Sequence, residues 1–209
     1  PLIPRPETEF WVEKVIHDIS SANTNTPHHG GLTPVTPKMR VLDLCAGSGC
    51  IGVAVAKALP FAHVDFVEID EHHHPTIQKN IRENGIEETR THIMGGNLFE
   101  NVQGTYELIL SNPPYIDQDL NRTDASVLAN EPHTALFAEN AGFAFIERIL
   151  RDAPKYLSPK GMLVIEHELE HVPQIETLAH SLSLTATPHP DQYGVLRYTI
   201  VTRNIPRNV

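Results

Sequence analysis

The sequence predicts an α/β fold in which a doubly wound, mostly parallel sheet carries helices on both faces. Three observations support this prediction. Short apolar runs alternate with longer segments of helical periodicity. A glycine-rich turn, residues 45–52, joins the first apolar run to the helix that follows it. The last apolar run, residues 195–202, alternates apolar and polar positions, which is typical of an antiparallel partner strand.

The composition is that of one globular domain. The 209 residues are 40% hydrophobic and 20% charged, enough to bury a sizeable core. No apolar run approaches the ~18 residues that cross a bilayer. The net charge of −10 disfavours tight binding to a nucleic-acid backbone, which needs clustered Lys and Arg. We therefore expect neither a membrane nor a nucleic-acid partner. Cys45 and Cys50 flank a turn rather than forming a disulfide framework, which favours a reducing compartment.

A helix is predicted from Pro6 onward. Its apolar stripe consists of Trp11, Val12, Val15, Ile16 and Ile19. Pro6 suits a first helical turn, and Glu7 and Glu9 complement the helix dipole. On this pattern alone, Arg5, Glu7 and Glu9 are better explained as a solvated helix start than as a site. Residues 1–20 thus form an amino-terminal segment and helix, while the Ser-, Thr- and Asn-rich residues 21–38 predict a flexible insertion.

The first strand, residues 39–44, leads into the glycine-rich turn, and a helix is expected over residues 53–59. Backbone N–H groups of such a turn can face a ligand. The glycines have the spacing of a dinucleotide fingerprint, a weak signal by itself. Asp43, however, ends the strand just before the turn. Its carboxylate would repel a pyrophosphate but suits the ammonium group of an amino-acid-bearing cofactor, which favours S-adenosylmethionine (AdoMet) over NAD.

Acidic and amide residues follow the next two strands. Residues 63–69 form a strand that ends in Glu68, placed where an acid reaches ribose hydroxyls. Asp70 is the competing candidate for that role. A helix over residues 74–84 and a strand over residues 89–94 come next. Asn97 would then hydrogen-bond an adenine amino group while Leu98 packs on the adenine ring. An Asn placed there only because turns favour it explains the sequence equally well.

The fourth strand, residues 106–110, ends at a stiff corner. Pro113 and Pro114 donate no backbone hydrogen bonds and hold the chain extended. The carboxamide of Asn112 and the ring of Tyr115 are thereby placed rigidly around a small planar group. The long polar segment 117–140 that follows is expected to be functional.

The remaining elements complete the alternation. A helix is predicted from Phe143 to Leu157, stopped by Pro159 and Gly161. A strand over residues 162–167 ends in Glu166 and His167, and a helix over residues 170–181 follows. The polar candidates at the carboxyl ends of strands, where such sheets bind ligands, are Asp43, Glu68, Asn97, Asn112 and Glu166. The thirteen histidines include contiguous runs without metal-ligand spacing, so no metal site is expected.

Five motifs in this order resemble the class I AdoMet-dependent methyltransferases, specifically the release-factor glutamine methyltransferases of the HemK/PrmC type. They are IPRPETE (residues 3–9), LDLCAGSGCI (42–51), NPPYI (112–116), EPHTAL (131–136) and IEH (165–167). NPPY alone is shared with adenine-N6 methyltransferases, whereas its combination with the flanking segments is highly specific. The resemblance implies a Rossmann-like, mostly parallel sheet of seven strands with an antiparallel C-terminal strand.

The resemblance also assigns site residues. The cofactor AdoMet, with S-adenosyl-L-homocysteine as its product, would be held by Cys45, Ala46, Gly47, Ser48, Gly49, Glu68, Leu98 and Asn112, with Asp43 and Asn97 added by the reasoning above. The substrate would meet Asn112, Pro113, Pro114 and Tyr115, together with Arg5 and Glu131 from the flanking motifs. Four positions depart from the family pattern: Cys45 and Ala46 stand where Gly and Thr are usual in the cradle, so that Ala46 lacks a hydroxyl, Glu68 stands where Asp is common, and Asn97 replaces a usual Asp. The family's N-terminal helical domain has no counterpart in this sequence.

The implied reaction moves a methyl group to the side-chain amide nitrogen of the glutamine in the Gly-Gly-Gln motif of a peptide chain release factor. The side-chain oxygen of Asn112 and the carbonyl of Pro113 would each accept one N–H of that amide, and Tyr115 would pack against its plane. The pattern requires no strong general base. The alternatives are an adenine-N6 nucleic-acid methyltransferase and a non-catalytic AdoMet-binding module. An NAD-linked oxidoreductase is disfavoured by Asp43. The insertion and the sequence of the glycine-rich turn resemble eukaryotic, organellar members of the family, so we expect the protein in the mitochondrial matrix or the cytoplasm. We also expect it to be a monomer.

Overall fold

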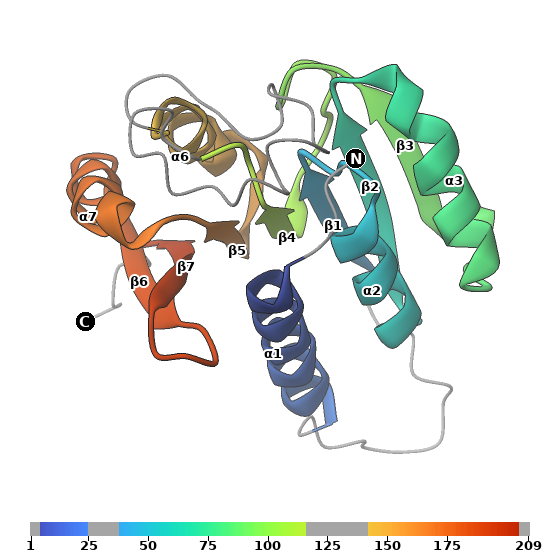
Figure 1. Ribbon diagram of the computed structural model, residues 1–209, viewed down its shortest axis with the longest axis horizontal. Helices are drawn as coiled ribbons and strands as arrows, with labels where there is room; N and C mark the ends of the chain where they lie inside the picture. The colour runs from blue at the N-terminus through green and yellow to red at the C-terminus, as the bar shows by residue number, and fades with distance from the viewer. Residues whose placement is uncertain (1–4, 25–37, 116–141, 205–209) are drawn as a thin grey trace, which may run out of the picture.

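A single seven-stranded sheet organises the chain. The computed structural model describes residues 5–24, 38–115 and 142–204. The strand order is β3-β2-β1-β4-β5-β7-β6 (Figure 1). The strands are β1 (Met39–Leu44), β2 (Ala62–Glu68), β3 (Thr91–Gly95), β4 (Tyr106–Ser111), β5 (Leu157–Glu166), β6 (Leu184–Pro190) and β7 (Leu196–Arg203). Strands β1 to β5 run parallel, and β7 is antiparallel to both of its neighbours. The predicted fold class is confirmed.

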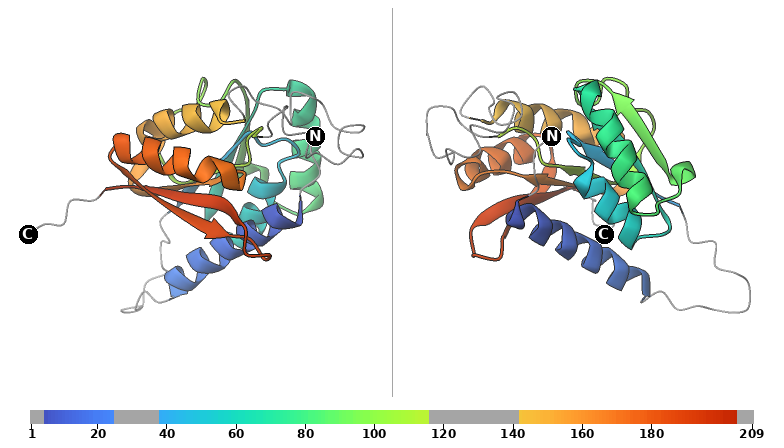
Figure 2. Two further views of the ribbon diagram at one scale, coloured as in Figure 1. Left: turned by 60° about the vertical axis from the view of Figure 1, so that its left-hand side comes forward. Right: turned by 45° about the vertical axis from the view of Figure 1, so that its right-hand side comes forward.

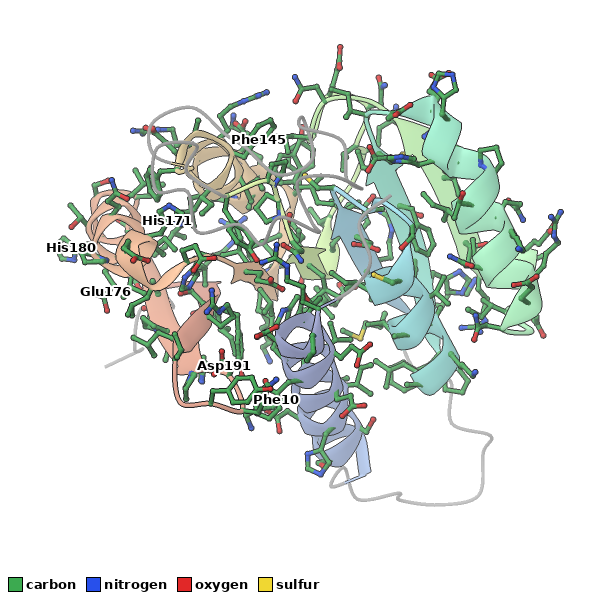
Figure 3. All side chains as sticks on the ribbon, in the orientation of Figure 1. Phe10, Phe145, His171, Glu176, His180 and Asp191 are labelled. Atoms are coloured by element: carbon green, nitrogen blue, oxygen red, sulfur yellow. The ribbon has the colours of Figure 1, made fainter. Side chains whose placement is uncertain are left out.

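Helices cover both faces of the sheet. They are α1 (Pro6–Thr24), α2 (Cys50–Ala58), α3 (His74–Glu83), α6 (Ala144–Tyr156) and α7 (Val172–Ser181), with 3₁₀ turns η1 (Glu71–His73), η2 (Glu88–Arg90) and η4 (Leu169–His171). Helices α1, α2 and α3 share one apolar core with the sheet, and α6 and α7 share the other (Figure 2). In Figure 3 the labelled Phe10 and Phe145 mark α1 and α6, on opposite faces. None of the described helices is long and apolar enough to cross a membrane.

Strand alternation decides which face each site residue meets. Val41, Val64 and Val164 lie in the core beneath α1, α2 and α3. Because side chains alternate along a strand, the residues two or four positions further on point to that same face. Asp43, Glu68 and Glu166 therefore all face the layer of α1 and α2.

Several elements differ from the sequence prediction. Helix α1 runs to Thr24, four residues into the expected insertion, because a helix with a buried apolar stripe propagates cheaply through Ser and Ala. Residues 25–37 of that insertion lie outside the described residues. Helix α6 ends at Tyr156, and the expected stop residues Pro159 and Gly161 instead lie in β5.

An irregularity in the pairing of β4 with β5 explains how these two residues fit into a strand. The register shifts from Tyr106↔Leu157 to Leu108↔Met162, so residues 158–161 lie out of register with β4. Pro and Gly are tolerated where the ladder is interrupted in this way. A Cβ on Gly161 would lie 2.6 Å from the carbonyl oxygen of Tyr106. Glycine is therefore required there by close backbone approach.

Strand β6 was assigned to no residue range by sequence reasoning. Its segment contains Pro188 and Pro190, which usually argue against a strand. The strand lies at the edge of the sheet and pairs with β7 alone. Proline is tolerated at such an edge because its missing N–H leaves no ladder bond unmade.

Candidate functional site

The predicted gathering of polar residues occurs at the carboxyl edge of the parallel strands. From β1 the chain continues outward through β2 to β3 and then crosses to β4 on the other side of β1, and a crevice forms at such a switch point. The register pairs Leu44 with Ser111, which brings the residues after β1 and after β4 to the same level. The Ser111 hydroxyl also donates to the Leu44 carbonyl at 2.8 Å. The glycine-rich turn and the Asn-Pro-Pro-Tyr corner are thus neighbours.

The turn after β1 forms an open cradle. Gly47 and Gly49 have φ of 55° and 77°, in the left-handed region that glycine adopts at little cost. A Cβ on Gly49 would lie 2.9 Å from Ile77, and one on Gly52 would lie 2.4 Å from Phe66, so both glycines permit close packing of α2. A Cβ on Gly47 would meet nothing within 4 Å. Gly47 therefore faces the space that a ligand would enter.

Helix α2 begins at Cys50, earlier than the predicted residue 53, with Gly49 as its N-cap. Its first turn therefore directs backbone N–H groups toward the cradle. Burial raises the pKa of the Cys45 thiol to about 12 and that of Cys50 to about 11. Both thiols stay protonated near neutral pH, so neither serves as a nucleophile.

Asp43 is a buried carboxylate with an incomplete set of partners. Its Oδ2 accepts the Gly52 N–H at 2.8 Å, while its Oδ1 is buried and has no hydrogen-bond partner among the described residues. Burial raises the pKa of Asp43 to about 7, the Gly52 N–H opposes this, and the negative charge of Glu68 adds to it. A cationic donor near Oδ1 would remove this cost. The site residue thus fits the ammonium group expected from the sequence.

Glu68 connects the end of β2 to the cradle. Its Oε2 accepts the Gly47 N–H at 2.7 Å, and its Oε1 accepts the Asp70 N–H at 2.9 Å. Each carboxylate oxygen keeps a further lone pair for a ligand hydroxyl. Asp70 instead caps η1, accepting from both the backbone N–H and the ring of His72 at 3.0 and 2.8 Å, which lowers the pKa of Asp70. The geometry favours Glu68 over Asp70 as the ribose ligand.

Ile69 is a candidate that sequence reasoning missed. Its side chain is 66% exposed directly after Glu68, at the ligand edge of the sheet. An apolar side chain left exposed at a strand end can contact a flat ring. The signal available in the sequence was its place between two acidic candidates.

Asn97 and Leu98 support the turn after β3. The Asn97 N–H donates to Glu100 Oε2 at 3.1 Å, and the Asn97 carbonyl accepts from the Glu100 N–H at 3.4 Å. Leu98 has a φ of 57° and packs in the core with 5% exposure. These contacts are those of a structural turn, so the adenine contacts of both residues stay predictions.

The Asn-Pro-Pro-Tyr corner begins immediately after β4. Asn112 and Pro114 are partly exposed, while Pro113 and Tyr115 are buried. The Tyr115 hydroxyl donates to Glu166 Oε1 at 2.5 Å, and its ring lies in the core shared with α6 and α7. Tyr115 therefore anchors the corner, and its expected packing against a substrate amide stays a prediction.

Glu166 is the buried acceptor on which the amino-terminal helix and the corner converge. Its Oε2 accepts from the Thr8 hydroxyl and the Trp11 indole N–H, each at 2.7 Å. Burial raises the pKa of Glu166, and the hydrogen bonds from Trp11, Tyr115 and Thr8 and the charge of Arg5 oppose that shift. The positive charge of Arg5 thus acts on this cluster, whereas its contact with a substrate stays a prediction.

Thr8 links this cluster to Asn112 and was missed by sequence reasoning. Asn112 Nδ2 donates to Thr8 Oγ1 at 3.2 Å. Thr8 is 2% exposed, although Glu9 beside it is exposed as a solvated helix start predicts. Its position three residues before the fully buried Trp11 places both on one helix face, and this spacing was the available signal.

His167, the last residue of the IEH motif, is structural. Burial lowers its pKa to about 4, so the ring is neutral. Its Nε2 lies 2.7 Å from the Thr199 hydroxyl and its Nδ1 2.9 Å from the Glu168 carbonyl. A neutral ring donates from Nδ1 and accepts at Nε2 here. The contact with Thr199 joins the residue after β5 to strand β7.

Two expectations remain, one on the segment after the corner and one on metal binding. Glu131, the EPHTAL motif and the segment 117–140 lie outside the described residues. Within residues 5–24, 38–115 and 142–204, no group of three or more His, Cys, Asp or Glu side chains is arranged to hold a metal ion.

Comparison with known proteins supports this picture. The family described as "Methyltransferase small domain" matches residues 32–131. The "Ribosomal protein uL3 glutamine methyltransferase" of Neisseria gonorrhoeae is 38% identical over 60% of this chain and 42% of its own length. The "Release factor glutamine methyltransferase" of Streptococcus pneumoniae is 32% identical over 79% of this chain and 53% of its own length. The chain thus spans about half the length of these curated relatives.

Solved structures share the fold at lower sequence identity. A methyltransferase from Pyrococcus furiosus has a TM-score of 0.58 and 16% identity, over 90% of this chain and 95% of its own. The human methyltransferase 10 domain containing protein has a TM-score of 0.58 and 17% identity, over 98% of this chain and 85% of its own. The strand order, the glycine-rich cradle and these sequence matches agree. The chain is therefore similar in sequence to glutamine methyltransferases of the HemK/PrmC-like family, and its fold is that of a class I methyltransferase.

Proposed function

We propose that this protein transfers a methyl group from AdoMet to the side-chain amide nitrogen, N5, of a glutamine in another protein. The observation that carries the proposal is the position of Asn112. Its carboxamide stands on a proline-stiffened corner after β4, at the level of the open cradle after β1, and its amino group is already bonded to Thr8. The names of the sequence relatives support the same reaction.

The cradle residues fit AdoMet as the methyl donor. Asp43 offers its unpartnered buried Oδ1 to the ammonium group, Glu68 its carboxylate to the ribose diol, and Ile69 its exposed side chain to the adenine ring. The space in front of Gly47 admits the ligand. When bound, AdoMet supplies an electrophilic methyl group on a sulfonium. The ammonium group would then be a partner for Asp43 Oδ1, which has no hydrogen-bond partner among the described residues.

The corner residues would hold the acceptor. An amide nitrogen is a weak nucleophile because its lone pair is delocalised into the carbonyl. The hydrogen bond to Thr8 uses Nδ2 of Asn112, which leaves Oδ1 to accept one N–H of the substrate amide. The Pro113 carbonyl would accept the other. Alignment of this kind can supply up to ~7–11 kcal/mol of a barrier, and these acceptors also stabilise the charge that develops on the nitrogen.

The preferred protein substrate is a peptide chain release factor with a Gly-Gly-Gln motif. The PRPETE and EPHTAL segments favour it, and the relative named for this substrate aligns over the larger share of the chain, 79%. Ribosomal protein uL3 is the second candidate, because several relatives of 38% identity carry its name.

Incubation with labelled AdoMet separates these substrates. We expect label in a release factor and none in its Gln→Ala variant, with uL3 and its corresponding Gln→Ala variant as a parallel arm. Label in uL3 alone would transfer the assignment to that protein. Label in DNA or RNA would instead support the adenine-N6 alternative. AdoMet binding without label in any acceptor would favour a non-catalytic binding module.

A further inference from the structure

The hydroxyl of Thr8 connects Asn112 to Glu166. Its hydroxyl lies 3.2 Å from Asn112 Nδ2 and 2.7 Å from Glu166 Oε2. Tyr115, at the other end of the corner, donates to Glu166 Oε1. Both ends of the Asn-Pro-Pro-Tyr corner are therefore held by one buried carboxylate, each through a different oxygen.

The direction of each proton in this chain follows from the donors available. The Trp11 indole can only donate, so Glu166 Oε2 must accept from it. Thr8 Oγ1 donates to the same oxygen at 2.7 Å, and its hydroxyl has a single proton to give. With that proton used, Thr8 Oγ1 can only accept from Asn112. The amino group of Asn112 is thereby directed to Thr8, and Oδ1 is directed away from it.

This orientation matters because a carboxamide has two faces of opposite polarity. Rotation by half a turn about the last side-chain bond exchanges the amino group and the oxygen of Asn112. The flipped side chain would present N–H groups to the amino group of a substrate glutamine, and two donors repel each other. Pro113 and Pro114 restrict the backbone of the corner, but they do not decide between these two side-chain orientations.

We infer that Thr8 is a positioning residue that fixes the orientation of the Asn112 carboxamide, with Glu166 fixing the direction of the Thr8 hydroxyl. The assignment of a catalytic consequence rests on the proposed function. The residues that hold Asn112 are tightly packed. Thr8 is 2% exposed, Trp11 and Glu166 are fully buried, and Glu166 is the last residue of β5. The chain thus prepares Asn112 before a substrate arrives.

Thr8→Val tests this role, because valine keeps the shape of threonine and removes the hydroxyl. We expect kcat to fall about three- to tenfold, the size of one neutral hydrogen bond, with the Kd for AdoMet and the KM for the protein substrate unchanged. Thr8→Ser, which restores the hydroxyl, should recover most of kcat. Thr177→Val on α7 is a matched change that removes a hydroxyl donating to the Pro173 carbonyl at 2.7 Å, and it should leave kcat unchanged.

A double-mutant cycle shows whether Thr8 acts through Asn112. In an Asn112→Ala background, Thr8→Val should cause no further loss of kcat. An equal fractional loss in both backgrounds would overturn the inference, since it would show that Thr8 acts without Asn112.

Nitrogen-15 NMR gives a readout that needs no activity. The side-chain NH₂ signals of Asn112, identified by their loss in Asn112→Ala, should show nuclear Overhauser contacts to Thr8 in the wild-type protein. They should shift and exchange faster with solvent in Thr8→Val but not in Thr8→Ser. Unchanged signals in Thr8→Val, or absent contacts in the wild type, would overturn the inference. If the Asn112 signals respond to Thr8→Val as expected but the protein methylates no glutamine, the proposed function is wrong, while the role of Thr8 in orienting Asn112 is still supported.

Discussion

The two ends of the parallel strands treat their carboxylates differently. Toward the amino ends, Asp65 accepts from Arg40 at 2.9 Å and from the Tyr106 hydroxyl at 2.7 Å, and the Arg40 guanidinium lies 4.3 Å from the centre of the Tyr106 ring. At the carboxyl ends, Asp43 is fully buried and has one backbone donor, and within the described part of the chain its second oxygen has no partner. We call these the closed cluster (Arg40, Asp65, Tyr106) and the open cluster (Asp43, Glu68, Asn112).

The difference separates stability from function. A carboxylate with a cation and a hydroxyl around it is complete within the protein, and its removal should cost stability alone. A buried carboxylate without such partners is costly to the free protein and is completed only by a ligand. Changes in the open cluster should therefore affect binding or turnover, and changes in the closed cluster should affect unfolding.

The largest effect is expected for Asn112→Ala. Loss of the carboxamide removes an acceptor that holds the substrate nitrogen, so kcat on a Gly-Gly-Gln substrate should fall by at least about 100-fold, as for other preorganised polar groups. AdoMet affinity, measured by calorimetry, should stay nearly intact. Full retained activity would contradict the role assigned to Asn112.

Asp43→Asn should change how stability depends on pH. The pKa of Asp43 is raised by burial from 3.8 to about 7, so between these values the folded protein holds a proton that the unfolded chain has lost. The free energy of unfolding contributed by this group therefore falls as pH rises from 3.8 to about 7, by at most about 1.4 kcal/mol per pH unit. Urea titrations across this range should give a flatter profile for Asp43→Asn.

The same group should make AdoMet binding depend on pH. An ammonium group near Asp43 favours the ionised carboxylate, so the affinity of the wild-type protein should rise as pH rises toward about 7. Asp43→Asn should lack this rise. An affinity that is independent of pH in the wild type would show that Asp43 does not face the ammonium group.

Glu68→Ala should weaken AdoMet binding about tenfold or more, because charge-assisted hydrogen bonds to the ribose hydroxyls are lost. Asp70→Ala is the matched control, since Asp70 caps η1 instead. Calorimetry on both variants decides the assignment. Unchanged affinity in Glu68→Ala with weakened affinity in Asp70→Ala would move the ribose contact to Asp70.

The smallest effect belongs to the closed cluster. Asp65→Ala leaves Arg40 and Tyr106 without their shared acceptor and should lower the free energy of unfolding by about 1–2 kcal/mol. The kcat and the AdoMet affinity should not change, because the cluster lies at the other ends of the strands. A loss of AdoMet affinity with unchanged stability would erase the contrast between the two clusters.

Sequence reasoning could predict the open cluster because parallel topology brings strand ends together. Asp43, Glu68 and Asn112 each follow or end an apolar run, and a doubly wound sheet places such ends at one edge. Sequence reasoning left Glu68 and Asp70 as alternatives for the ribose contact, and the cap that Asp70 makes on η1 favours Glu68.

The contacts between distant segments could not be predicted. Thr8 and Asn112 are 104 positions apart, and nothing in a local pattern links them. The sequence shows an aromatic residue at position 115 but not where its side chain points. Its hydroxyl donates to Glu166, which is 51 positions away in the sequence. Strand β6 was hidden by its prolines, which only its place at the sheet edge makes tolerable.

The most direct test of the account locates the transferred methyl group. A release factor is incubated with AdoMet and this protein, digested, and analysed by fragmentation mass spectrometry. We predict one added methyl group on the side-chain nitrogen of the glutamine in the Gly-Gly-Gln motif with the wild-type protein, and almost none with Asn112→Ala. A methyl group on another residue type, or equal methylation by Asn112→Ala, would contradict the claim that this corner aims a glutamine amide at the cradle.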